Sequence, residues 1–258
     1  MKTNKPLEEL PGHWLLAAMG KKVLRTGGKE LTTKLINGIA IGSDDDIVEF
    51  APGLGFTASL ALRNNPKSYT AIELDKEAAT NLNHIVHGAN RRIIQADASQ
   101  TPLDANSCNK VYGEAMLTMQ ADHRKAEIIR EAHRILEPGG YYGIHELGLV
   151  NIESEDHKAT IQRKLAKTIR VNARPLTQEE WHTLLQKEGF EIVQTFTNSM
   201  RLLEFGRMAD DEGFFRALKI CFNIALRPKV TKRILAMRKV FTDYKQNMNA
   251  IAIIPTNP

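Results

Sequence analysis

The sequence predicts an α/β fold around a mostly parallel sheet, on three observations. Short apolar runs that fit buried strands recur at 47–50, 69–74, 91–96 and 110–113. Amphipathic stretches that fit helices lie between and after them, for example at 76–87 and 123–136. A glycine turn, Gly53-Leu54-Gly55, joins the first run directly to a helical stretch. Strands that alternate with helices usually pair in parallel, because each helix carries the chain back along the sheet.

Composition and length favour one soluble domain with additions. The 258 residues can bury a proper core, and 42% hydrophobic with 25% charged residues is ordinary for a globular protein. The two cysteines, Cys108 and Cys221, show no metal-ligand spacing, so no metal site is predicted and a reducing compartment is expected. No apolar run approaches the ~18 residues needed to cross a bilayer. We therefore expect a cytoplasmic protein.

The glycine turn predicts a cofactor loop. A strand, a glycine turn and a helix bring bare backbone close to a small ligand at a helix N-terminus. The second strand ends in Glu73, 20 positions after Gly53, the spacing at which a carboxylate meets ribose hydroxyls. Gly53, Gly55 and Ala58 also fit a loose dinucleotide pattern, so an NAD-dependent oxidoreductase is one alternative.

Three further features favour a different cofactor. Glu49 lies just before the loop, where a pyrophosphate has no use for a carboxylate but an ammonium group does. Asp97 and Ala98 follow the third strand, placed to cap an adenine ring. The stretch Leu136-Glu137-Pro138-Gly139-Gly140-Tyr141 marks a helix end that turns into a strand.

Together these residues resemble the class I S-adenosylmethionine-dependent methyltransferases over roughly 46–147. The resemblance implies a Rossmann-like sheet of seven strands with helices on both faces and an antiparallel last strand. It implies S-adenosylmethionine as the cofactor, with its methionine part in the loop, its ribose on the second-strand acid and its adenine on the third. One departure is Ala51, which replaces the family's usual first loop glycine. The predicted cofactor-binding residues are Glu49, Gly53, Gly55, Glu73, Leu74, Asp97, Ala98 and Glu114.

The predicted catalytic residues follow the fourth and fifth strands. Methyl transfer from a sulfonium is a direct displacement that needs positioning and no covalent enzyme intermediate. Base and amide N-methyltransferases usually carry Asn or Asp and then Pro-Pro after the fourth strand, whereas this chain has Glu114-Ala115-Met116. Glu114 is a candidate to face the sulfonium or orient a hydroxyl. His145 is a candidate base, because histidine titrates near the working pH.

Four further residues are weaker candidates. Glu146 would point to the face opposite His145, and His123 follows the fourth strand at some distance. Met116 and Met119 are placed to line an apolar acceptor pocket.

Two segments outside the core are predicted to be helical. Residues 1–43 form an N-terminal extension. About fifty residues, 200–247, separate the last two predicted strands, where a hairpin would need only a few, so they form a cap. Residues 44–199 and 248–258 then make up the cofactor-binding domain.

Basic charge gathers in that cap. Residues 216–245 hold nine lysines or arginines and one acid, so this segment carries +8 against +5 for the chain. The predicted roles are a solvated helix surface, contact with an anionic membrane, or contact with nucleic-acid phosphates. The membrane role draws on four interleaved apolar residues, Phe214, Phe215, Leu218 and Phe222.

The expected function is S-adenosylmethionine-dependent methylation of a small molecule at oxygen, carbon or sulfur. The broad group that includes the ubiquinone and menaquinone methyltransferases is similar in general appearance. An RNA methyltransferase using the basic cap, the oxidoreductase, and a non-catalytic cofactor-binding protein are the alternatives. Nucleic acid is not the expected partner, peripheral membrane contact stays open, and the oligomeric state is not predicted.

Overall fold

An eight-stranded sheet runs through the molecule in the order β3-β2-β1-β4-β5-β8-β7, with a short β6 beside β5. The computed structural model describes residues 6–24, 26–200 and 203–258. Besides β6, which also pairs in parallel with β5, five longer strands form the parallel part: β1 (Asp46–Phe50), β2 (Ser68–Glu73), β3 (Arg91–Gln95), β4 (Cys108–Glu114) and β5 (Leu136–Leu149). The last strand, β8 (Met248–Thr256), runs antiparallel to β5 and to β7 (Glu191–Ser199). The predicted α/β fold and its antiparallel last strand are confirmed.

Two differences from the predicted sheet are small. The sheet has one strand more than predicted, β6 (Leu176–Thr177), which has two residues and carries no sequence pattern of its own. The fifth strand begins at Leu136 instead of Tyr141, because Leu136 already pairs with Cys108 of β4 before an irregular stretch, with Gly139 at φ +80°, leads to the regular pairing from Tyr141 onward.

Helices cover both faces of the sheet, because side chains alternate along each strand. Ile47 of β1 points to one face and Val48 to the other, and each lies in a separate buried cluster. The first face is covered by α2 (Gly28–Gly38), α3 (Phe56–Leu62) and α4 (Lys76–Leu82). The second is covered by α5 (Asp122–Ile135) and α7 (Gln178–Lys187), and a capping box of Thr177 with Glu180 opens α7.

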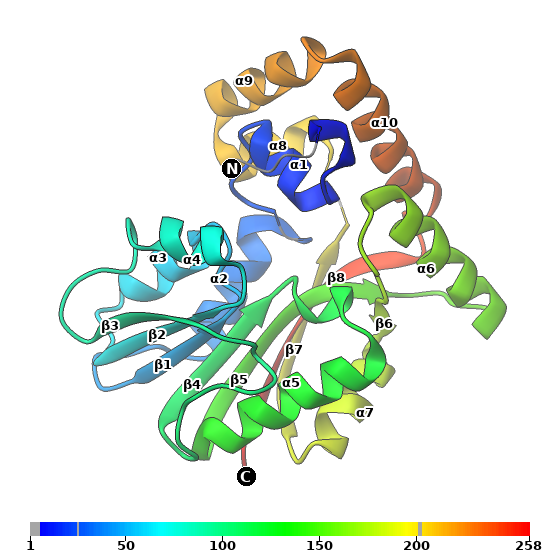
Figure 1. Ribbon diagram of the computed structural model, residues 1–258. Helices are drawn as coiled ribbons and strands as arrows, with labels where there is room; N and C mark the ends of the chain where they lie inside the picture. Colours follow the sequence, from blue (N-terminus) through cyan, green and yellow to red (C-terminus); the bar gives the residue numbers. More distant parts are fainter. Residues whose placement is uncertain (1–5, 25, 201–202) are drawn as a thin grey trace.

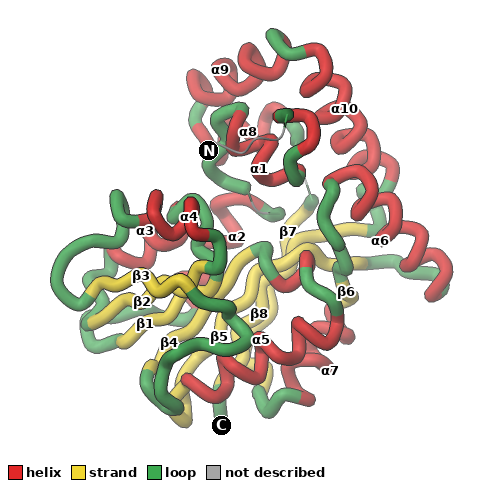
Figure 2. The backbone as a smooth tube through the Cα atoms, in the orientation of Figure 1, coloured by secondary structure: helices red, strands yellow, loops and turns green. Residues whose placement is uncertain are grey.

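A second core forms a helical cap at one end of the molecule (Figure 1). Its members come from both ends of the chain: Leu15 and Met19 pack with Met208, Ile220 and Met237. Figure 2 shows the strands as one sheet with these helices gathered beyond its end. The elements are η1 (Leu7–Glu9), α1 (Gly12–Ala18), α8 (Phe205–Glu212), α9 (Phe214–Ala225) and α10 (Pro228–Asp243), with α6 (Glu155–Ile169) beside α10.

The N-terminal extension is therefore divided. The sequence suggested one unit over residues 1–43, but α1 belongs to the cap while α2 packs on the sheet. The inserted segment predicted at 200–247 holds three helices; residues 201 and 202, like 1–5 and 25, lie outside the described part. Within the described ranges, no helix is both long and apolar enough to span a membrane.

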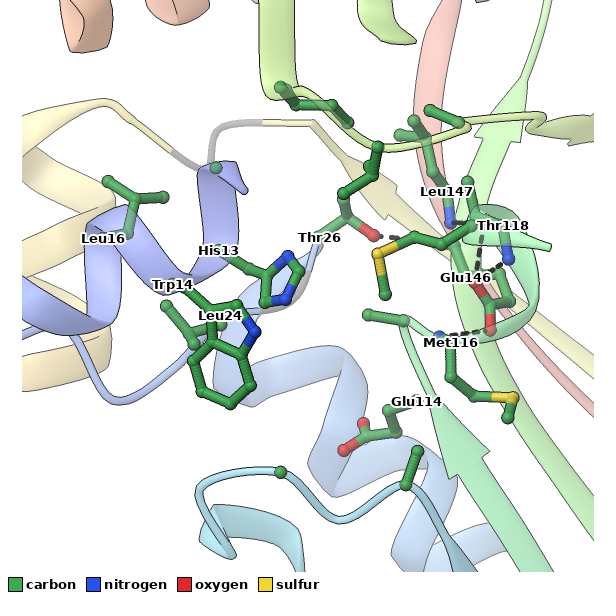
Figure 3. A pocket seen from close by; sticks show the side chains of 18 of the residues that line it. His13, Trp14, Leu16, Leu24, Thr26, Glu114, Met116, Thr118, Glu146 and Leu147 are labelled. Carbon is green, nitrogen blue, oxygen red and sulfur yellow. Dashed lines mark hydrogen bonds between the residues drawn. The ribbon is translucent and has the colours of Figure 1, made fainter. Parts of the chain in front are cut away.

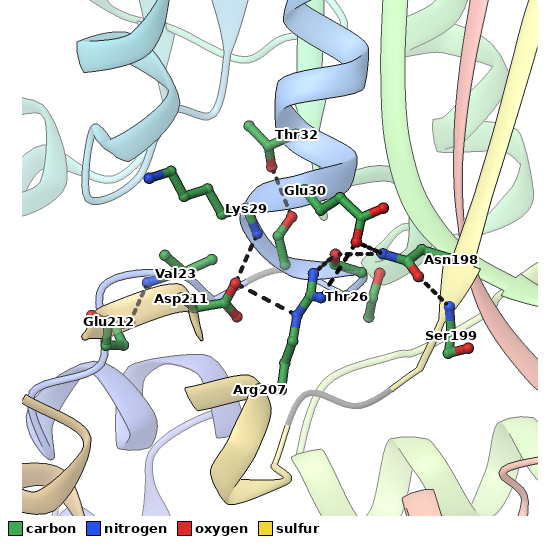
Figure 4. Close-up of polar contacts among 12 residues, drawn as sticks. Val23, Thr26, Lys29, Glu30, Thr32, Asn198, Ser199, Arg207, Asp211 and Glu212 are labelled. Carbon is green, nitrogen blue, oxygen red and sulfur yellow. Dashed lines mark hydrogen bonds and ion pairs between the residues drawn. The ribbon is translucent and has the colours of Figure 1, made fainter. Parts of the chain in front are cut away.

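Polar contacts fasten the chain between α1 and α2 to helix α8 (Figure 4). The Glu212 carboxylate accepts hydrogen bonds from the backbone N–H groups of Lys22 and Val23, at 2.7 and 2.8 Å. Asp211 accepts another from Lys29 N–H at 2.9 Å, and Arg207 donates to the Gly27 carbonyl. This connecting segment then runs along the wall of the site.

Candidate functional site

A cavity of about 280 Å³ lies between the cap and the carboxyl ends of the parallel strands. Such crevices at strand ends are where open α/β sheets bind ligands. Figure 3 shows His13 and Trp14 of α1 opposite Met116 and Leu147 of the sheet side. Apolar side chains make up most of the wall: Trp14, Leu16, Leu24, Leu54, Met116, Met119, Leu147, Ile169, Val171, Met200, Met237 and Phe241.

The two loop glycines have different roles. A Cβ at Gly53 would meet only the Ala51 carbonyl oxygen, at 3.9 Å, so this backbone opens onto free space at the cavity. A Cβ at Gly55 would lie 2.6 Å from Ile85 Cδ1, so Gly55 permits packing against the helix region and does not line the main cavity. Ala51 has φ +50°, the left-handed backbone that glycine adopts most readily. This explains why the family prefers glycine at that position.

Glu73 joins this loop to the second strand. Its side chain accepts hydrogen bonds from Gly53 N–H at 3.1 Å and from Asp75 N–H at 3.0 Å. It is 6% exposed and lines the cavity, and burial raises the pKa of its carboxyl. Because a carboxylate has about four acceptor positions, two remain for hydroxyl donors. The open backbone at Gly53 and the spare acceptors of Glu73 fit a nucleoside cofactor with a ribose diol.

Glu114 lies at the end of β4 and also lines the cavity. Its Oε1 accepts a hydrogen bond from Thr32 Oγ1 at 2.7 Å, and its Oε2 accepts one from Thr57 Oγ1. Its third neighbour is His145, whose Nδ1 is 2.7 Å from Oε1. The carboxylate is therefore fixed from α2, α3 and β5 together.

His145 itself is fully buried and does not line the cavity. Its Nε2 is 2.5 Å from the Thr26 carbonyl oxygen, which can only accept a hydrogen bond. Both ring nitrogens are thus engaged within the protein. The structure places His145 behind Glu114. The predicted base therefore has no ring nitrogen directed into the cavity, where a methyl acceptor would bind.

Glu146 is the residue of this pair that borders the cavity. Its carboxylate accepts hydrogen bonds from the backbone N–H groups of Met116, Leu117 and Thr118, at 2.8 to 3.0 Å, and from the Thr118 hydroxyl at 2.6 Å. Burial raises its pKa, which these four bonds counteract. All four acceptor positions are used, so Glu146 holds the loop after β4 in shape. Met116 and Met119 on that loop line the cavity as predicted.

Glu49 lies away from the cavity. Strand alternation turns it to the α2 and α3 face, where it is 3% exposed and accepts hydrogen bonds from the hydroxyls of Tyr69 and Tyr112. Contact with a cofactor ammonium group would require it to leave both tyrosines. The two tyrosine hydroxyls therefore supply hydrogen bonds to this buried carboxylate from within the protein.

The third-strand residues lie beyond the same cavity. Asp97 accepts hydrogen bonds from Ser99 N–H at 2.9 Å and from Arg124 at 2.6 Å, and Ala98 is buried behind it. Leu74 is 65% exposed, and His123 does not line the cavity either. The roles of Asp97, Ala98 and Leu74 at the adenine end stay predictions.

Several residues that line the cavity or hold Glu114 were not predicted from the sequence. His13 faces the cavity from α1, and burial lowers its pKa to about 4, so the ring is neutral at neutral pH. Thr32 and Thr57 hold Glu114 from helices that precede it by 82 and 57 positions. The apolar run from Trp14 to Met19 was the one available signal for α1, and it did not show which face would meet the cavity.

Comparison with known proteins identifies the family. A family model described as a methyltransferase domain matches residues 48–144. A protein of Haemophilus influenzae described as uncharacterized is 34% identical over 246 residues, which cover 94% of this chain and 96% of that one.

Solved structures agree in fold. The [4+2]-cyclase SpnF superposes with a TM-score of 0.71 at 18% identity, over 94% of this chain and 90% of its own. A sarcosine dimethylglycine methyltransferase homologue from Galdieria sulphuraria gives 0.69 at 11% identity, over 88% and 84%. The methyltransferase domain match begins in the strand before the glycine loop and ends in β5, so it spans Gly53, Glu73 and Glu114. This chain belongs to the class I S-adenosylmethionine-dependent methyltransferases.

Proposed function

We propose that this enzyme transfers the methyl group of S-adenosylmethionine to oxygen, carbon or sulfur of a small, predominantly apolar acceptor. The observation that carries the proposal is the apolar wall of the cavity on the side of the cap. Among its described lining residues, Lys22 is the single lysine or arginine. A strongly anionic acceptor would need more cationic partners than this wall offers.

Different residues around the cavity would serve the cofactor, the methyl group and the acceptor. Gly53 and Glu73 would hold the methionine and ribose parts of the cofactor, which supplies an electrophilic methyl group when bound. Glu114, fixed by Thr32, Thr57 and His145, presents a carboxylate to the cavity and so favours positive charge there. Residues of α1, α6 and α10 would exclude water from the acceptor, because methyl transfer needs two reactants held close together and dry.

His13 gives the apolar wall one polar contact. A neutral imidazole can donate or accept one hydrogen bond, which suits a hydroxyl or carbonyl on an otherwise apolar molecule. This role follows from its position in the cavity wall and from its low pKa.

The test is a transfer experiment with methyl-labelled S-adenosylmethionine and an extract of cells. The extract is incubated with the wild-type enzyme or with a Gly53→Val variant, and then divided into solvent-extractable small molecules, water-soluble small molecules, RNA and protein. We expect label in the solvent-extractable fraction with wild-type enzyme alone. Label confined to RNA would replace this proposal by the RNA methyltransferase alternative, and label in polar small molecules would overturn the apolar acceptor.

A further inference from the structure

Helix α9 lies at the outer end of the cap (Figure 1). Several of its apolar side chains are exposed to solvent. Phe215 is 85% exposed, Phe222 63% and Phe214 57%. Phe205 of α8 extends this surface, since its ring lies 6.5 Å from that of Phe214 in an edge contact. Leu218 and Leu226 are exposed on the same helix or directly after it. We call these six residues the α9 surface.

The opposite side of α9 explains why the helix holds this position. Ala217 and Ile220 are buried in the cap core with Leu15 of α1 and with Met19 directly after it. These buried residues attach α9 to the cap. The α9 surface is a separate apolar area on the exposed side of the helix. Large exposed patches of this kind mark interaction sites, because solvated aromatic side chains are costly to leave in water.

The charges around the α9 surface indicate which partner fits. From Gly213 to Thr242 the chain contains no acidic residue. Arg216 and Lys219 lie on α9 among the exposed apolar residues, and Arg227, Lys229 and Lys232 follow directly. Aromatic side chains next to lysine and arginine on one helix are the pattern of peripheral helices that lie in the plane of an anionic bilayer.

We propose that α9 docks this enzyme onto anionic lipid bilayers, with Phe214, Phe215 and Phe222 entering the interfacial layer and Lys219 and its basic neighbours contacting lipid phosphates. Charge complementarity selects the bilayer over a second copy of the chain, because two α9 surfaces brought face to face would bring two sets of cations together. The proposal rests on the α9 surface alone and does not depend on the identity of the methyl acceptor.

The test is sedimentation of the full-length protein with vesicles of phosphatidylcholine mixed with phosphatidylglycerol, and with vesicles of phosphatidylcholine alone. Wild-type protein should bind the anionic vesicles at least tenfold more tightly, and added salt should weaken this binding. A Phe215→Ser/Phe222→Ser variant should lose at least tenfold in vesicle affinity. The matched control is Val193→Ser, which removes a 51% exposed apolar side chain on β7 and should bind like wild type.

Thermal unfolding of each variant and size-exclusion chromatography accompany the assay. Because Phe215 and Phe222 are mostly exposed, the double variant should keep the melting temperature of the wild type. A Lys219→Glu variant gives a second, charge-based measure and should also bind more weakly. Absence of wild-type binding to either vesicle, or equal binding by the double variant, would overturn the proposal. A wild-type dimer that ignores vesicles and becomes a monomer in the double variant would assign the α9 surface to a second copy.

Discussion

His145 Nδ1 lies 2.7 Å from Glu114 Oε1, and both side chains are almost completely shielded from solvent. The other ring nitrogen of His145 bonds the Thr26 carbonyl just before α2. This histidine therefore connects the segment entering α2 to the tip of β4, and its contacts assign it to holding Glu114 in place. The role differs from that of a base, which needs a free nitrogen near the acceptor.

A His145→Gln variant tests that difference. If His145 positions Glu114, kcat should fall by about tenfold, well short of the ~10²–10⁴ that general-base catalysis contributes. The shape of the pH profile of kcat should also remain, because no titrating group is removed from the reaction. Measured kcat values across pH, with S-adenosylhomocysteine affinity as the folding control, decide the point. A thousandfold loss of kcat, together with loss of the acidic limb of its pH profile, would instead show that His145 acts as a general base.

Gly53→Val should abolish cofactor binding while the fold persists. A valine side chain would project into space that now belongs to the cavity, and φ is +55° there. The matched control is Gly88→Val, where φ is +107° and no atom lies within 4 Å of a Cβ, so the change strains the backbone at least as much without touching the cavity. Calorimetric titration with S-adenosylhomocysteine should show binding for the control and none for Gly53→Val. Equal binding by the two variants would mean that the loop does not hold the cofactor.

Glu73→Ala should weaken S-adenosylhomocysteine binding by roughly 1.5–3 kcal/mol for each charged hydrogen bond that is lost. The side chain also accepts from Gly53 N–H, so its removal loosens the loop as well. Glu179→Ala, which removes an exposed carboxylate from α7, is the control for a change of charge alone. Calorimetry that finds the same affinity for both variants would rule out Glu73 as the ribose ligand.

His13 predicts a dependence of stability on pH. Its folded-state pKa is about 4 because of burial, against an ordinary value of 6.5, so the unfolded chain takes up the proton first as pH falls. Stability from the neutral buried ring is therefore complete above pH 6.5 and is lost as pH falls towards 4. Between pH 7 and pH 5 this amounts to about 2 kcal/mol.

Urea unfolding of wild type and His13→Gln at these two pH values measures the effect. The variant lacks the titrating ring, so its stability should fall by about 2 kcal/mol less over the same interval. Equal pH dependence in both proteins would show that His13 is as accessible to protons in the folded state as in the unfolded chain.

Local sequence patterns predicted the sheet because they act over short distances. Alternating apolar runs, the glycine turn and the capping box of Thr177 and Glu180 are each contained within a few residues. The orientation of Glu49 was also present in the pattern: Val48 and Phe50 point one way along β1, so Glu49 points the other. Its place next to the loop along the chain favours contact with the cofactor, whereas the alternation of β1 directs its side chain to the opposite face.

Long-range packing determines what the sequence could not predict. Thr32 and Thr57 contact Glu114 only because α2 and α3 meet the tip of β4 in space. Gly53 and Gly55 are two positions apart, yet one opens onto the cavity and the other allows Ile85 to approach. Placement of α1 in the cap depends on helices about 200 positions later, and no local pattern carries such information.

The shared core of α1 with α8, α9 and α10 has a consequence for synthesis on the ribosome. Leu15 and Met19 leave the exit tunnel early, but Met208, Ile220 and Met237 follow only near the end of translation. At roughly 5–20 residues per second the N-terminal apolar helix waits on the order of ten seconds or more without its partners. During that interval it is a natural substrate for chaperones that hold nascent chains, and the cap can be completed only near the end of translation.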